Sequence, residues 1–278
     1  MKVVSARTID QALAALAGAT SASRILAGGT DLVVEMESGR TRPDFVLDVG
    51  RVRELRWIRE TEAGVEIGAG TTCTDIVGSS ELARHADLVV ESAREVGAVQ
   101  IQNRATIGGN LGTASPAADL VPVLFALGAR VRLCSHAGSR ELAIEDFVTG
   151  YRTTARRHDE LIESIALPRR PVGERRAFRK VGTRRAQSIS KVVVALALGP
   201  RGSGARIAAG SVAECTVRLR ALEAAVAAGI EPGTIASAVR LALQHDVRPR
   251  DDVRSTALYR RAVLERLLTR LITDLLSD

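Results

Sequence analysis

The sequence predicts an α+β fold in which two α/β subdomains are followed by a smaller C-terminal α+β domain. Over residues 24–49, strand-like and helix-like segments alternate, and a glycine pair follows the first strand. Short strand-like runs separated by glycine-rich turns come next, which is typical of a further sheet. Beyond residue 168, three strand-like runs precede three helix-like segments, which indicates an antiparallel sheet covered by helices.

The N-terminal elements follow from caps and apolar spacing. Apolar residues recur at helical spacing up to Leu16, Thr8 or Asp10 can cap that helix, and Gly18 ends it. A short apolar strand then runs directly into Gly28. The other elements expected in this first subdomain are a helix or loop at 30–38 and a strand at 43–49.

The remaining elements are expected from the same two periodicities. In the second subdomain we expect strands at 55–58, 64–70 and 130–134, and helices beginning at 74 and spanning 87–96 and 117–127. In the C-terminal part we expect strands at 177–181, 190–198 and 205–212, and helices at 218–228, 235–243 and 256–276. An apolar stripe from Leu258 to Leu275 marks the last helix. We therefore expect domains at 1–167, with subdomains about 1–55 and 56–167, and at 168–278.

Two glycine pairs, at Ala27–Asp31 and at Thr106–Asn110, are flanked by small polar residues. Paired glycines permit positive φ and let a ligand approach the backbone closely. Successive amides in such turns form concavities that suit phosphate oxygens. Two such turns suggest one extended ligand with a diphosphate. Either pair alone is more typical of a tight turn that only reverses the chain.

The charge does not by itself identify a partner. The chain has a net charge of +7, and residues 151–278 hold 24 of the 39 basic and 13 of the 32 acidic residues. The densest basic part, Arg152–Arg185, is either a solvated face or a docking surface for an acidic partner. No helix-turn-helix or RNA-binding motif accompanies it, so we expect no nucleic-acid binding.

Metal sites and membrane spans are not expected. Cys73, Cys134 and Cys215 stand alone, without metal-ligand spacing, and are interpreted as buried structural thiols. The four histidines are isolated and interpreted as surface residues. No stretch approaches about 20 consecutive apolar residues, and no signal peptide is recognisable, so we expect a cytoplasmic protein.

Five segments, taken together, resemble the FAD-binding medium subunit of the xanthine dehydrogenase and carbon monoxide dehydrogenase family of molybdenum hydroxylases. In chain order they are Ile25–Leu32, Pro43–Glu54, Ile101–Gly128, Phe178–Lys191 and Asp251–Arg261. The resemblance spans essentially the whole chain. The joint spacing of these segments is specific, and it favours the ligand-binding interpretation of the glycine pairs over simple turns.

The resemblance implies an FAD-binding domain of the p-cresol methylhydroxylase or vanillyl-alcohol oxidase type, with the FAD extended across the cleft between subdomains. It implies no catalytic acid or base on this chain. A cationic side chain near the flavin, such as Lys180, can stabilise its anionic reduced state. The residues implied to contact the FAD are Ile25, Leu26, Ala27, Gly28, Gly29, Thr30, Asp31, Leu32, Thr106, Ile107, Gly108, Gly109, Asn110, Asp119, Ile162 and Lys180.

The resemblance also implies partners. A large subunit would carry the molybdenum cofactor and a small subunit two [2Fe–2S] clusters, in a dimer of heterotrimers. Electrons would reach the FAD from these clusters and leave to NAD⁺ or another acceptor, as in xanthine dehydrogenase. Ile189 matches the position of a tyrosine near the flavin in carbon monoxide dehydrogenases. The alternatives are a self-sufficient flavin oxidoreductase of the same fold and a non-enzymatic basic binding protein.

Overall fold

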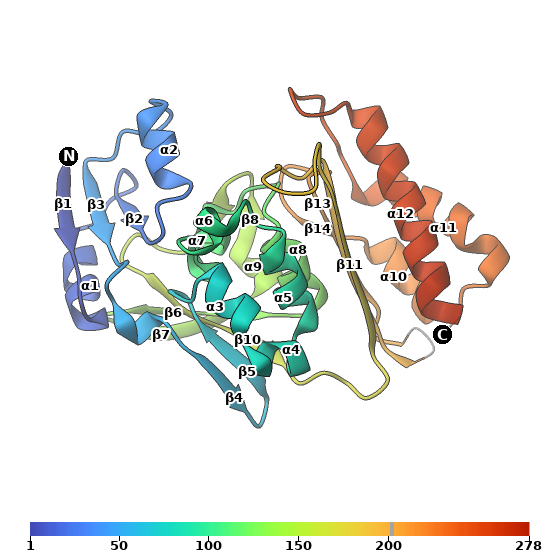
Figure 1. Cartoon of the computed structure of the whole chain (residues 1–278), viewed down its shortest axis with the longest axis horizontal. Helices are drawn as coiled ribbons and strands as arrows, with labels where there is room; N and C mark the ends of the chain where they lie inside the picture. Colours follow the sequence, from blue (N-terminus) through green and yellow to red (C-terminus); the bar gives the residue numbers. More distant parts are fainter. Residues whose placement is uncertain (201–202, 278) are drawn as a thin grey trace.

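The computed structural model describes residues 1–200 and 203–277, and it confirms the predicted α+β architecture. Figure 1 shows the first subdomain at one end, a helix-rich central subdomain, and a C-terminal sheet whose outer face is covered by three helices. Within the described ranges, no helix is both long and apolar enough to cross a bilayer.

The first subdomain is a three-stranded parallel sheet in the order β1-β3-β2. Helix α1 begins as predicted at Thr8, whose hydroxyl accepts a hydrogen bond from the Gln11 amide at 3.2 Å. Strand β1, at the edge of the sheet, was not predicted. The elements are β1 (Lys2–Ser5), α1 (Ile9–Leu16), β2 (Arg24–Leu26), α2 (Leu32–Glu37) and β3 (Phe45–Asp48).

The central subdomain is built on a five-stranded antiparallel sheet in the order β4-β5-β10-β6-β7. The prediction of a strand at 55–58 is wrong, because Leu55 ends a 3-10 helix and its fully buried side chain anchors the chain there. The strands are β4 (Ile58–Thr61), β5 (Gly64–Gly68), β6 (Arg130–Ser135), β7 (Gly138–Ala143) and β10 (Leu161–Pro168), and a small ribbon joins β8 (Val148–Gly150) to β9 (Thr153–Thr154).

Seven short helices belong to this subdomain. The predicted helices at 87–96 and 117–127 are present in slightly shorter form as α5 and α8. The whole set is α3 (Cys73–Gly78), α4 (Ser80–His85), α5 (Asp87–Arg94), α6 (Val99–Gln102), α7 (Ile107–Thr113), α8 (Leu120–Ala126) and α9 (Ile144–Phe147).

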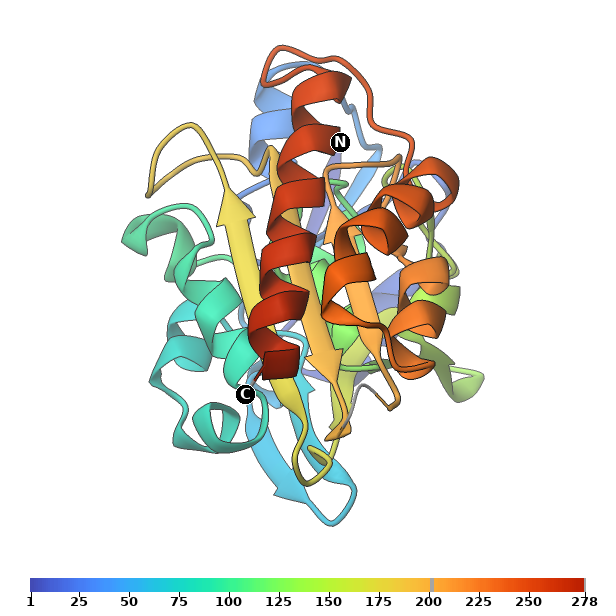
Figure 2. The same ribbon diagram turned by 90° about the vertical axis from the view of Figure 1, so that its right-hand side faces the viewer.

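The C-terminal domain is a four-stranded antiparallel sheet in the order β11-β12-β13-β14, with α10, α11 and α12 on one face, as Figure 2 shows. Leu258 lies at the start of α12 but is 79% exposed, so the predicted apolar stripe begins later, at Leu264. The elements are β11 (Arg175–Val181), β12 (Val192–Leu198), β13 (Arg206–Gly210), β14 (Val217–Arg218), α10 (Arg220–Ala227), α11 (Ile235–Asp246) and α12 (Ala257–Ser277).

Strand β12 connects the two large cores of the molecule. Its side chains alternate between the sheet faces, as the two-residue period of a strand requires. Val193 and Ala195 pack into the core that contains α8, whereas Val192 and Val194 pack against the C-terminal helices. All seven residues of β12 are buried, so the C-terminal sheet is fixed against the central subdomain.

Candidate functional site

A large cleft lies where the first subdomain, the central subdomain and the C-terminal domain meet. Its volume is about 2250 Å³. Typical small-molecule pockets measure about 300–1000 Å³, so this cleft has room for a long, extended ligand. Its lining comes from widely separated segments: 21–35, 49–56, 101–119, 151–162, 187–190, 211–214 and 250–260.

The first glycine pair forms a turn between β2 and α2, as predicted. Gly29 has a positive φ of 79°. Gly28 lies against the second subdomain, because an added Cβ would sit 1.9 Å from the carbonyl oxygen of Arg104. Within the described ranges, the amides of residues 28–31 donate to no protein acceptor. A run of available amides on the cleft wall suits the oxygens of a phosphate group.

The second glycine pair is built differently, and the prediction of an amide cradle there is wrong. Gly108 and Gly109 lie in the first turn of α7, and neither has a positive φ. Their amides are already used. The Gly108 amide donates to Ala69 O at 2.9 Å, and the Gly109 amide donates to the Thr106 hydroxyl at 3.0 Å. The N-cap hydroxyl of Thr106 and the Ala69 carbonyl therefore satisfy the donors that the sequence suggested for a ligand.

Gly108 is required for close packing. A Cβ at this position would lie 2.6 Å from the Cβ of Ala69, so α7 could not approach the end of β5. Thr106, Gly109 and Asn110 line the cleft beside it. Ile107 faces the core and is fully buried, away from the cleft.

Asn110, which lines the cleft, carries a hydrogen-bond acceptor without a partner in the described part of the chain. Its Oδ1 atom is buried and has no hydrogen-bond partner among the described residues. A buried carbonyl without a donor is costly, so a ligand that donates an N–H or O–H here would be favoured. The polar edge of a flavin and the ribityl and ribose hydroxyls of FAD carry such donors.

Asp119 and Lys180 form a buried ion pair at the cleft wall. Lys180 Nζ lies 2.7 Å from Asp119 Oδ2 and donates to Glu95 O at 2.6 Å. Ser190 donates to the other carboxylate oxygen at 2.5 Å. Burial raises the pKa of the Asp119 carboxyl, and the Lys180 ammonium opposes that rise.

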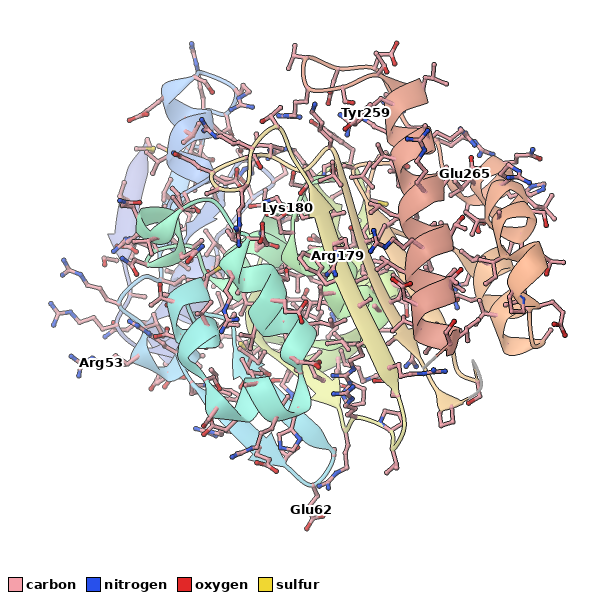
Figure 3. The ribbon with its side chains drawn as sticks, turned by 45° about the vertical axis from the view of Figure 1, so that its right-hand side comes forward. Arg53, Glu62, Arg179, Lys180, Tyr259 and Glu265 are labelled. Atoms are coloured by element: carbon pink, nitrogen blue, oxygen red, sulfur yellow. The ribbon has the colours of Figure 1, made fainter. Side chains whose placement is uncertain are left out.

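Only one residue of this ion pair lines the cleft. Asp119 lines the cleft, whereas Lys180 is only 3% exposed and lies behind it. Figure 3 shows Lys180 on β11, where this strand faces the helices of the central subdomain. Any effect of Lys180 on a ligand in the cleft therefore passes through Asp119.

Two isoleucines supply apolar surface. Ile162 on β10 is 7% exposed, and its side chain meets Gly112 of α7. Ile189 is 52% exposed on the loop before β12 and lies at the cleft wall. A ring system at this end of the cleft would contact aliphatic side chains.

The sequence did not reveal how Arg260 shapes the cleft. This arginine of α12 is 3% exposed and holds three segments together. It donates to Lys191 O at 2.6 Å and to Ser211 O at 3.0 Å, and it pairs with Asp252 at 2.7 Å. The loop at 250–256 is thereby fixed as one wall. The segment Asp251–Arg261 contributed to the family resemblance, but the sequence did not indicate that Arg260 links these segments.

The cleft is strongly basic. Twelve arginines and six carboxylates line it. Burial lowers the pKa of Arg156, and the neighbouring Arg24 lowers it further although Glu160 opposes this. An anionic ligand relieves such repulsion. The charge, the available amides at 28–31 and the Asn110 acceptor together fit the diphosphate and the polar groups of FAD.

Part of the predicted basic surface is used internally. Arg170 pairs with Asp87 at 3.2 Å, and Arg176 pairs with Glu174 at 2.6 Å. Arg152 pairs with a glutamate of the first subdomain. Several charges of the Arg152–Arg185 stretch therefore hold the fold together and are not available to a partner.

The cysteines are unsuited to chemistry in this cleft. Cys73 and Cys134 are buried, and Cys215 is half-buried. Burial raises the pKa of Cys73 to about 12 and that of Cys134 to about 11, so both remain thiols at neutral pH.

Two sequence families match the chain in tandem. Residues 1–170 match the family described as FAD binding domain in molybdopterin dehydrogenase. Residues 176–275 match the CO dehydrogenase flavoprotein C-terminal domain. The first match covers more than half of the chain and includes both glycine pairs.

Individual relatives cover nearly the whole length. The glyceraldehyde dehydrogenase medium chain of Sulfolobus acidocaldarius is 31% identical over 94% of this chain and 93% of its own. The nicotinate dehydrogenase FAD-subunit of Eubacterium barkeri is 32% identical over 91% of this chain and 88% of its own.

A solved structure shows the same arrangement. The carbon monoxide dehydrogenase of Hydrogenophaga pseudoflava contains a chain that superposes with a TM-score of 0.92 at 27% identity, covering 97% of this chain and 95% of that one. The two domain matches, the full-length relatives and the basic cleft lead to the same conclusion. The chain belongs to the family of FAD-binding medium subunits of the molybdenum hydroxylases.

Proposed function

We propose that this chain is the electron-transfer subunit of a molybdenum-dependent hydroxylase or dehydrogenase. It would hold FAD. This FAD would receive electrons from the iron–sulfur clusters of a small subunit and pass them to NAD⁺ or another final acceptor. The observation that carries the proposal is the basic, three-sided cleft, whose lining combines the available amides at 28–31 with the unpartnered Asn110 acceptor. Bound FAD supplies both two-electron and one-electron chemistry, and the protein supplies binding and orientation.

Different residues of the chain would bind different parts of the FAD. The turn at Gly28–Asp31 would bind the diphosphate through backbone amides, which cost little steric space. Asn110 would accept a hydrogen bond from the ligand. Asp119, held by Lys180 and Ser190, would fix a polar or charged group of the flavin end, so Lys180 would act as a positioning residue.

The names of the relatives support the proposed partners. Those names specify a medium chain and an FAD-subunit, which supports a complex with a large molybdenum subunit and a small [2Fe–2S] subunit. We further propose that the complex is a dimer of heterotrimers and that it has an activity of the xanthine dehydrogenase type. We also propose the domain division at 167/168. It falls one residue before the end of β10 at Pro168, and the connection at 169–174 that leads to β11 supports a boundary in this region.

Cofactor binding is tested on the purified full-length chain. The wild type should retain or take up one FAD, seen by visible absorption and by the flavin released on denaturation. Gly28→Ala should lose FAD, because its Cβ would collide with Arg104 O and separate the two subdomains. Gly18→Ala is the matched control, since an added Cβ there meets no atom within 4 Å. A colourless wild type that takes up no FAD would refute the proposal.

Electron transfer is tested on the complex. Co-expression with the proposed molybdenum and [2Fe–2S] subunits should yield a complex that contains molybdenum and iron. The organic substrate should reduce the flavin only in this assembled complex. Substrate turnover by the isolated chain would instead favour the self-sufficient flavin oxidoreductase. Reduction by NADH in single-turnover absorption measurements identifies the acceptor.

A further inference from the structure

One ion pair joins the first subdomain to the central subdomain across the cleft. Glu35 on α2 accepts a hydrogen bond from Arg152, 117 residues further along the chain. The exposed fractions of the two side chains are 29% for Arg152 and 20% for Glu35, so the pair is largely withdrawn from water. Both residues line the cleft.

Helix α2 has few other means of staying in place. None of its residues is buried, and Val33 and Val34 are 40% and 50% exposed. In Figure 1 it lies at the top of the first subdomain, above β2. A helix with so little buried apolar surface depends on the few specific contacts that it makes.

The backbone of Arg152 belongs to the tight turn between β8 and β9. Its φ is +50°, a left-handed conformation that residues with a Cβ rarely adopt outside such turns. The turn fixes where the Arg152 side chain leaves the central subdomain. The adjacent strands β8 and β9 flank Arg152, so its position is set by the central subdomain.

The cleft therefore has a fixed side and a latched side. At the fixed side, Gly28 lies against the backbone of Arg104. At the latched side, the ion pair between Glu35 and Arg152 links the first subdomain to the central subdomain at the cleft wall. From this arrangement, and on the basis of the proposed FAD binding, we propose that the Glu35–Arg152 latch controls the escape of FAD, and that both are positioning residues.

The test is the dissociation rate of FAD from the full-length holoprotein. It is followed after strong dilution by the rise in flavin fluorescence, in the presence of a phosphodiesterase that cleaves released FAD to the more fluorescent FMN and so prevents rebinding. Glu35→Gln and Arg152→Gln should each release FAD about three- to fivefold faster than the wild type, near the upper end expected for a partly exposed ion pair. The exchanged pair Glu35→Arg with Arg152→Glu should restore slow release. Raising the salt concentration should accelerate release from the wild type more than from either single variant.

The direction of the Glu35→Gln effect separates a latch from direct binding. If Arg152 binds an FAD phosphate itself, removal of the competing Glu35 carboxylate slows release, and the latch is refuted. Single variants that release FAD within twofold of the wild type also refute it. Arg240→Gln, which breaks the exposed Arg240–Glu265 pair far from the cleft, is the matched control and should leave the rate unchanged. A wild type that binds no FAD refutes the proposed function instead.

Discussion

Removal of the Lys180 ammonium should destabilise the folded chain strongly and in a pH-dependent way. Lys180→Met keeps the length and apolar stem of the side chain but leaves Asp119 as a carboxylate that is 8% exposed, 2.7 Å from the lost partner. Breaking a buried pair by deleting one partner costs about 3–5 kcal/mol. The Ser190 hydroxyl, 2.5 Å from Asp119, remains and reduces the loss, so we expect about 3 kcal/mol.

The sign of the pH dependence follows from the remaining carboxyl. Burial already raises the pKa of Asp119, and without Lys180 that pKa rises further. A carboxyl with a folded-state pKa above its unfolded value destabilises the fold as pH rises through the folded pKa. The loss should therefore be larger at pH 8 than at pH 5.

Urea unfolding of the apo chain at both pH values measures this loss as a difference in free energy of unfolding. Lys191→Met is the matched control, because Lys191 lies over the Tyr259 ring at 5.1 Å and such a contact is worth about 0.5–1 kcal/mol. A loss below about 1 kcal/mol for Lys180→Met, equal at the two pH values, would refute the assigned role of the ion pair.

Three further predictions test other parts of the structure. Gly108→Ala should lower the free energy of unfolding by about 2 kcal/mol, because the new Cβ collides with Ala69, and an unchanged denaturation midpoint would contradict this packing. Burial would raise the pKa of Asp75, but hydrogen bonds from Arg56 and Thr72 lower it to about 2. Its carboxylate therefore contributes stability above the unfolded pKa near 3.8, about 1 kcal/mol after allowance for its exposure, which is lost as pH falls towards 2. Wild type and Asp75→Asn should thus converge in acid denaturation curves below pH 3, and parallel curves would contradict the assignment. Cys73, with a pKa of about 12, should resist iodoacetamide at pH 8 until the chain is unfolded, as mass spectrometry of native and denatured samples can show.

Local patterns predicted the elements whose formation depends on near neighbours. Thr8 caps α1 within three residues, and the α12 stripe repeats along one helix. The strand predicted at 190–198 forms at 192–198, where all seven residues are apolar and buried on both faces of the sheet. The prediction failed where a distant residue decides the conformation. Leu55 belongs to a 3-10 helix because the core holds its side chain, and β1 is too short to show a period.

The candidate site shows the same division. The sequence alone determined that the glycine pairs, Lys180 and five spaced segments belong to one flavin-binding family, since these are matters of residue type and order. Only the tertiary structure decided what each does. Gly108 admits Ala69, Lys180 meets Asp119 across 61 residues, and Glu35 meets Arg152 across 117. Contacts between residues so far apart in the chain leave no local periodicity, because they are set by how the packed subdomains meet.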